Sequence, residues 1–224
     1  MRSLDLAEIA VRDLNEELHR SPAGRWEVLN PAGRHAVAVG MTVGHAIDIR
    51  GHVGYYCAGM NQEAEIFVHG TCGVGVAENM MSGKVVVEGD ASQAAGASAH
   101  GGLLVIGGNA AARCGISLKG ADIVVRGSVG HATGFMSQSG SIVVCGDAGE
   151  ALGDSIYEAR IYVRGEVAGL GADCVAKDFA EQHRLEVGEL LDRAGLGEVD
   201  PGEFLRYGSA RRLYNFDVDD AGDY

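Results

Sequence analysis

The stretch DIVVRGSVGHATGFMSQSGSIVVCG, residues 122–146, contains two copies of the pattern that decides the fold. In each copy a run of apolar, mostly β-branched residues ends at a glycine, Gly127 or Gly146. β-Branched runs with period-two alternation indicate β-strands. The same pattern occurs seven times, as AIDIRG (46–51), EIFVHG (65–70), KVVVEG (84–89), LLVIGG (103–108), DIVVRG (122–127), SIVVCG (141–146) and RIYVRG (160–165).

The repeat has a nearly constant length. Its marker glycines follow one another after 19, 19, 18, 20, 19 and 19 residues. A unit this short cannot form a βαβ unit, which needs about 30 residues, but it matches one coil of a parallel β-solenoid with coils about 4.8 Å apart. We therefore predict an all-β fold, a single-stranded right-handed parallel β-helix of about seven coils. The glycines expected to turn the chain after each strand are Gly51, Gly70, Gly89, Gly107, Gly127, Gly146 and Gly165.

Residues at the same position of successive coils should stack into rows. The apolar row predicted to fill the interior is Ile49, Val68, Val87, Ile106, Val125, Val144 and Val163. The row predicted to point outward is Arg50, His69, Glu88, Gly107, Arg126, Cys145 and Arg164.

The two ends of the chain differ from the repeats, and we expect them to cover the open strand edges of the solenoid. Residues 1–34 are predicted to be an N-terminal capping arm with a short helix over 11–20. A shortened unit, HAVAVG (35–40), would open the parallel β-helix over 35–174. Residues 175–224 are predicted to be a C-terminal helical cap, with a helix over 175–194 and Gly195 as its C-cap, followed by an acidic tail.

Composition narrows the functional classes. Glycine makes up 35 of 224 residues and proline only 3, which indicates an ordered, turn-rich fold and not collagen or Pro-rich disorder. The net charge of −13 argues against nucleic acid or an anionic membrane as the partner. The five cysteines lack C-x-x-C spacing, and neither a signal peptide nor a transmembrane segment is evident. We expect a cytoplasmic protein without disulfides.

The sequence offers no assembled chemistry. A P-loop and a dinucleotide-binding fingerprint are absent. Cys57 and Cys72 occupy different positions of successive units, so the cysteines are predicted to be inert core residues and not ligands. We predict no catalytic, cofactor-binding or metal-binding residue in this chain. The open alternative is a stand-alone carbohydrate-active β-helix enzyme using the carboxylate pairs Glu63/Glu65, Glu88/Asp90 or Asp147/Glu150, although a row of aromatic sugar platforms is missing.

A group of polar, Tyr and Met residues falls mainly in loops and corners of the first two coils. Tyr and Met are typical of contact surfaces, and His100 precedes a Gly-Gly corner. The residues predicted to face a partner are Tyr55, Tyr56, Asn61, Glu78, Asn79, Met80, Met81 and His100.

Several stretches carry a resemblance to known families. The Gly-rich coils, including GVG (73–75) and GLG (169–171), and the segment EFLRYGSARRLYNF (203–216) resemble the "G-x-G-x-G" β-helix domain at the C-terminus of the glutamate synthase large subunit. That domain is similar to one of the subunits of formylmethanofuran dehydrogenase. GHVGYYCAGMNQ (51–62), GVAENMMSG (75–83), HGGLLVIGGNAAARCGIS (100–117) and CGDAGEALGDSIYEARIYVRG (145–165) resemble the small, stand-alone β-helix subunits of N-methylglutamate synthase, also called GlxC-like.

The resemblance implies a place in an enzyme complex. It implies a glutamine-amidotransferase-like partner and a second partner that carries FMN and an iron–sulfur cluster, with no cofactor in this chain. The implied reaction converts glutamate and methylamine to N-methylglutamate and ammonia. Equivalent subunits of a glutamate synthase or of a formylmethanofuran dehydrogenase-like complex remain alternatives. In each case the β-helix would be a rigid scaffold without an active site of its own.

Overall fold

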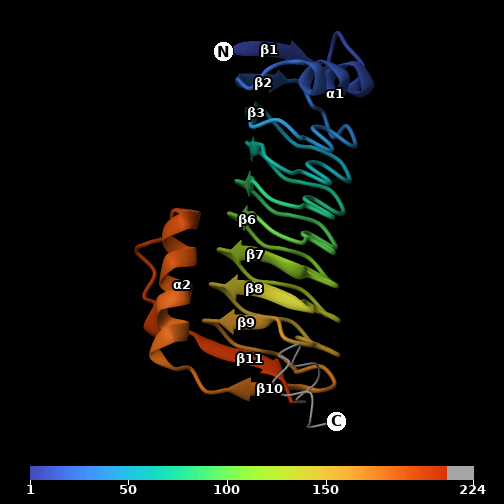
Figure 1. Ribbon diagram of the computed structural model, residues 1–224. Helices are drawn as coiled ribbons and strands as arrows, with labels where there is room; N and C mark the ends of the chain where they lie inside the picture. Colours follow the sequence, from blue (N-terminus) through green and yellow to red (C-terminus); the bar gives the residue numbers. More distant parts are fainter. Residues whose placement is uncertain (211–224) are drawn as a thin grey trace, which may run out of the picture.

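The computed structural model describes residues 1–210, and it is a parallel β-helix whose strands form one sheet along the stack (Figure 1). The strands are β1 (Arg2–Asp5), β2 (Arg25–Leu29), β3 (Ala46–Ile49), β4 (Glu65–Val68), β5 (Lys84–Val87), β6 (Leu103–Ile106), β7 (Lys119–Val125), β8 (Ser139–Val144), β9 (Arg160–Val163), β10 (Cys174–Lys177) and β11 (Leu205–Ser209). Their order in the sheet is β1 to β9 in sequence, then β11 and β10. The helical elements are α1 (Val11–Arg20), α2 (Glu181–Ala194) and the 3-10 turn η1 (Pro201–Glu203).

The seven predicted strands all form, and their register is more regular than the glycine spacing indicated. From β3 to β9 residues pair with the residue 19 positions later, as Ile49 does with Val68, except that Lys119 pairs with Ser139 beside a register shift. The register pairs Ile106 with Val87, so Gly107 lies beside Glu88 and is not the equivalent of Gly89. The turn glycine of that coil is Gly108, whose N–H donates to the Gly89 carbonyl at 3.0 Å. The choice of Gly107 was therefore wrong, because the coil has two adjacent glycines and only pairing distinguishes them.

The predicted interior row is confirmed. All seven of its members, from Ile49 to Val163, have no exposed surface. A second inward row lies two positions earlier in each strand and includes Ile47, Ile123 and Ile161, which are also fully buried. Together these rows form most of one continuous apolar core inside the stack.

The sheet begins earlier than residue 35. β1 and β2 pair in parallel with each other, and β2 pairs in parallel with β3. HAVAVG (35–40) is not a strand: it lies in the loop that follows β2. The strand of that coil is RWEVL, whose register to β3 is 21 residues, so the fixed spacing of the repeat did not reveal it.

The predicted N-terminal helix forms over the predicted residues and caps the first coil. Leu14 and Leu18 are fully buried beneath it. Asn15 replaces a missing neighbouring coil, since its Nδ2 donates to the Ala36 carbonyl at 2.8 Å and its Oδ1 accepts the Ala38 N–H at 2.9 Å. The loop of the first coil therefore keeps hydrogen bonds that the stack would otherwise provide.

The C-terminal helix also forms, from Glu181 and not from Val175, because residues 174–177 pair with β11 as strand β10. Gly195 ends it in the left-handed conformation, as predicted. α2 runs along the side of the stack, against the outer surface of the sheet (Figure 1). The edge of β9 is covered by β11, which pairs with it in antiparallel orientation. The acidic tail lies outside the described residues.

Candidate interaction surface

Each coil carries, opposite its strand, a six-residue turn segment with an unusual backbone. The seven segments, hereafter the turn segments, are residues 35–40, 55–60, 74–79, 93–98, 112–117, 131–136 and 150–155. In each, the second, fourth and sixth residues have positive φ, as in Tyr56 (60°), Ala58 (56°) and Met60 (54°). Their backbone N–H groups point alternately to the next and the previous coil: Tyr56 donates to Val74 and Ala58 to Val37. The turn segments thus form a second inter-coil ladder beside the sheet.

The positive φ values affect which residue types occur in this ladder. An L-residue in the left-handed region costs about 1–2 kcal/mol, least for Gly and Asn. Seven of the twenty-one positions are accordingly Gly or Asn, and ten more are Ala or Ser. Four are large instead: Tyr56, Met60, Arg113 and Met136. Met60 and Met136 are 44% and 40% exposed, so burial of their side chains does not offset the backbone cost.

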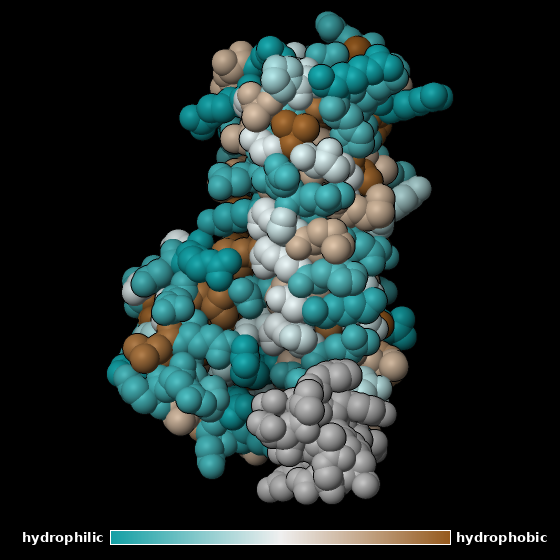
Figure 2. Space-filling model, in the orientation of Figure 1, coloured by the Kyte–Doolittle hydropathy of each residue, from teal (hydrophilic) through white to brown (hydrophobic). Residues whose placement is uncertain are grey.

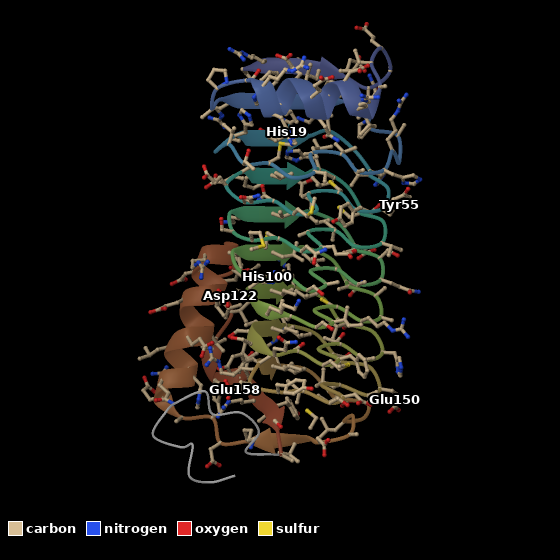
Figure 3. The ribbon with its side chains drawn as sticks, turned by 45° about the vertical axis from the view of Figure 1, so that its right-hand side comes forward. His19, Tyr55, His100, Asp122, Glu150 and Glu158 are labelled. Atoms are coloured by element: carbon tan, nitrogen blue, oxygen red, sulfur yellow. The ribbon has the colours of Figure 1, made fainter. Side chains whose placement is uncertain are left out.

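The exposed side of these segments, hereafter the turn face, is also where the sequence placed several candidate residues. Tyr55 is 54% exposed, and its ring stacks on His35 with 4.0 Å between ring centroids. The next residue of its row, Val74, is 48% exposed. Figure 3 shows Tyr55 and Glu150 projecting from the turn side of the stack, away from the strands. Met60, Val74 and Met136 were not among the predicted partner-facing residues. The period of 19 relates Val74 to Tyr55 and Met136 to Met60, and could have indicated a common face.

The other predicted partner-facing residues divide into three groups by their exposure. Met81, which follows the turn segment 74–79, is 47% exposed, and His100 is exposed. Tyr56, Glu78 and Asn79 are half-buried.

Asn61 and Met80 are fully buried, so their prediction as partner-facing residues was wrong. The tenth position after the turn glycine points inward. There Asn61 binds the backbone of Ala64 and the Ser82 carbonyl, and Met80 packs in the core.

The corner between strand and turn segment has a polar row that the sequence analysis did not identify. Asp90, Asn109, Ser128 and Asp147 stack one coil apart, and each side-chain oxygen accepts the backbone N–H of the next residue of the row at 2.7–2.9 Å. The period of 19 would have aligned these residues. Asp90 and Asp147 thus accept backbone N–H groups, and Glu88 is bonded to His69, so three of the six carboxylates considered for carbohydrate chemistry have structural partners.

α2 covers the outer surface of β6–β9. Val105, Val124, Val143 and Tyr162, the middle outward residues of these strands, pack against Val187, Leu190 and Leu191 of the helix. Glu186 of α2 anchors the contact by accepting hydrogen bonds from Ser141 (2.5 Å), Arg160 (3.1 Å) and Tyr162 (2.9 Å). Burial, and then the Glu186 charge, raise the pKa of Tyr162.

The outer surface of β3–β5 is charged instead. His69 lies between two carboxylates, with Nε2 2.9 Å from Asp48 and Nδ1 2.8 Å from Glu88. Its hydrogen bond to Asp48 is the main cause that raises its pKa. Arg50 pairs with Glu27 one strand away.

The cysteines are buried and unpaired, as predicted for core residues. Desolvation raises the pKa of Cys114 to about 12 and that of Cys174 to about 11, so neither thiol is ionised near neutral pH. Cys57 and Cys72 are neighbours despite their different positions in the repeat, and Cys57 is the main cause that raises the pKa of Cys72.

Two further observations concern metal sites and membrane-spanning helices within residues 1–210. No group of three or more His, Cys, Asp or Glu residues in this part of the chain has metal-binding geometry. Within the same residues no helix is both long and apolar enough to cross a membrane.

One open cleft, of about 410 Å³, lies where the end of the sheet meets residues 198–203. It is lined by Arg126, Arg164 and Cys145 from the sheet and by Glu198, Val199, Asp200 and Glu203. Arg164 pairs with Glu203 at 3.6 Å, and burial raises the pKa of the Cys145 thiol. The three carboxylates outnumber the two guanidinium groups, so the cleft has no excess positive charge for an anion.

The fold and its surfaces define a class: a parallel β-helix with one face covered by its own helix and an exposed face of Tyr, Met and Val side chains. No protein-family profile matches the chain. The curated protein called Protein GlxC, from Rhizobium meliloti (strain 1021), is 58% identical over 228 residues, which cover all of both chains. The chain belongs to the GlxC family.

Proposed function

We propose that this chain is a non-catalytic scaffolding subunit of a glutamate synthase-like complex, most specifically of N-methylglutamate synthase. In this proposal it holds a glutamine-amidotransferase-like subunit and a subunit that carries FMN and an iron–sulfur cluster. The assembled enzyme would make N-methylglutamate and ammonia from glutamate and methylamine. The chain itself would carry no cofactor, and the complex would be cytoplasmic.

The observation that carries the proposal is the combination of a stiff stack with an exposed apolar face. Seven coils at about 4.8 Å make a rod about 30 Å long, and almost every coil is tied to the next through both the strand and the turn-segment ladders. A rod of this kind can hold two catalytic subunits at a fixed distance, and misplacement by about 1 Å can cost much of a rate. The resemblance of residues 51–62 and 145–165 to small β-helix subunits, and full-length membership of the GlxC family, support the choice of complex.

The test is purification of a tagged copy from its native host, with mass spectrometry of the associated proteins and an absorbance spectrum. We expect stoichiometric amidotransferase-like and flavin-bearing subunits and a yellow-brown colour. Activity with glutamate and methylamine, assayed beside activity with 2-oxoglutarate and glutamine, then separates N-methylglutamate synthesis from glutamate synthesis. A colourless protein without partners would refute the scaffold proposal.

A further inference from the structure

The turn face carries large, exposed side chains at positions where most other coils have small ones. Its ladder accepts Ala, Ser or Asn at the positive-φ positions, as the coils with Ala94 and Ser98 show. Met60 and Met136 occupy the same row as Ser98 and point into solvent. The core does not bury them, and exposed apolar side chains that gather on one face mark contact sites, so these side chains point to a contact outside the chain.

The composition of the face matches the centre of a protein interface. Such centres are enriched in Tyr, Met and Arg and depleted of Lys and acidic residues. The turn segments 55–60, 74–79 and 93–98 contain Tyr55, Met60 and Val74 as exposed apolar residues and one charged residue, Glu78. Brown and tan residues interrupt the hydrophilic surface on this side of the upper coils (Figure 2).

The charge of the face changes along the stack. The last turn segment carries Glu150 and Asp154, and Asp147 precedes it at the corner. None of these three forms an ion pair with any other residue in the described range. The face is thus apolar at the upper coils, carries the exposed guanidinium of Arg113 in the segment 112–117, and is acidic at the lower end.

This change in charge along the turn face indicates which kind of molecule binds there. A two-fold contact must be self-complementary. If two copies joined their turn faces side by side, acidic ends would meet, and if they joined head to tail, each apolar end would meet an acidic end. We propose that the turn face binds a different polypeptide, with an apolar surface opposite Tyr55, Met60 and Val74 and a basic surface opposite Glu150 and Asp154. Seven segments at about 4.8 Å give a height of about 30 Å, the dimension of a standard interface of about 800 Å² per partner.

The proposal deepens the proposed function, since it assigns the scaffold's partner-binding surface. The test variant replaces four residues by those that the chain itself uses at equivalent positions: Tyr55→Gln and Val74→Gln, as in Gln93, and Met60→Ser and Met136→Ser, as in Ser98. The matched control, Leu185→Gln with Leu205→Gln, removes two apolar side chains, each 58% exposed, from outside the turn face. Both variants should keep the far-UV circular dichroism and thermal midpoint of the wild type.

The measurement is the amount of identified partner subunit that co-purifies per mole of tagged chain from the native host. We expect at least a tenfold loss for the four-residue variant and less than twofold for the control. In the wild-type complex, amide hydrogen exchange should be slowed in peptides over residues 74–81 and 131–137, relative to the isolated chain. Equal co-purification by wild type and the four-residue variant would overturn the inference and leave the proposed function standing.

Two outcomes with the wild type alone separate the proposals further. A chain that purifies by itself as a dimer, which the four-residue variant converts to a monomer by light scattering, would overturn the choice of a different polypeptide. A wild-type chain that is monomeric and without partners would overturn both the inference and the proposed function.

Discussion

The strand side and the turn side of each coil repeat with the same period but obey different rules. On the strand side, extended backbone favours β-branched residues, and Val125 stacks between Ile106 and Val144. On the turn side, positive φ at alternate residues favours glycine, such as Gly115 (66°), and most other positions hold small residues, such as Ala132 (55°). The difference teaches that a large residue is unremarkable on the strand side and informative on the turn side, where most coils have Gly, Ala, Ser or Asn.

Val125→Asp should have the largest effect, because it attacks the strand side at a fully buried position. The ladder offers no partner for a carboxylate there, and an unpaired buried charge costs more than 4–5 kcal/mol, a large part of the usual stability of a domain. We expect loss of folding and of co-assembly together, measured by circular dichroism and soluble yield. Arg126→Asp is the control: it places the same charge one residue away, on an exposed side chain, and should fold. A normally folded Val125→Asp variant would contradict the assignment of inner and outer rows.

The strand side was also the more predictable one. Alternation and period identified the seven strands and the inner row, because both follow directly from stacking one coil on the next. The turn segments were not predicted, since alternating positive φ leaves only a weak preference for Gly, Ala, Ser and Asn. The position of α2 could have been predicted but was not. The middle outward row Val86, Val105, Val124 and Val143 is apolar, and an apolar outer row of this length has to be covered.

The candidate surface was predicted only in part. Tyr55 and Met81 were predicted from their residue types, which do not show whether a side chain points into the core or into solvent. Asn61 and Met80 were misassigned because they lie between a turn segment and the next strand. In that stretch the chain has no regular alternation that separates inward from outward positions. Met136 was missed because it lies four coils away from the cluster in the sequence.

Gly115→Ala should have the next largest effect, because it tests where the two sides meet. A Cβ at Gly115 would lie 2.6 Å from Ile142 Cδ1. In the coil where Ala58 holds the equivalent position, the residue in the place of Ile142 is Val85, which lacks that atom. Ala58 also has φ of 56°, so the backbone accepts alanine. We expect Gly115→Ala to lower the free energy of unfolding by about 1–3 kcal/mol, measured in urea.

The matched rescue is Gly115→Ala with Ile142→Val. Ile142→Val alone should cost about 0.5–1.5 kcal/mol, and the double variant should lose clearly less than the sum of the two single losses, since removing Cδ1 removes the clash. Additive losses would show that the strand and turn sides do not share this contact.

Glu186→Gln addresses the covered part of the strand side, with a smaller effect on stability. The charge of Glu186 contributes to raising the pKa of Tyr162, behind burial. Removing the charge should lower the pKa of Tyr162 but leave it above its ordinary value of about 10, as followed by tyrosinate absorbance against a Tyr162→Phe reference. We expect a loss of about 1–2 kcal/mol from the weakened hydrogen bonds to Ser141 and Arg160. An unchanged tyrosinate titration would show that Glu186 does not face Tyr162 in solution.

His69→Gln addresses the uncovered part, and its effect should be the smallest and depend on pH. Asp48 and Glu88 face the imidazole from the neighbouring strands, while Arg50 opposes its charge, and the net result is a raised pKa. A raised pKa means that the folded state favours the protonated form. The stabilisation is therefore complete below about pH 6.5, the usual value for histidine, and disappears as pH rises through the higher pKa of the folded state. Because these groups are near the surface, the amplitude should be only about 0.5–1 kcal/mol. Urea unfolding of wild type and His69→Gln between pH 5.5 and 8.5 should give a difference that shrinks with rising pH. A difference that grows with pH would mean that the carboxylates of β3 and β5 do not hold the imidazolium, and that the charged half of the outer sheet surface is held together by other contacts.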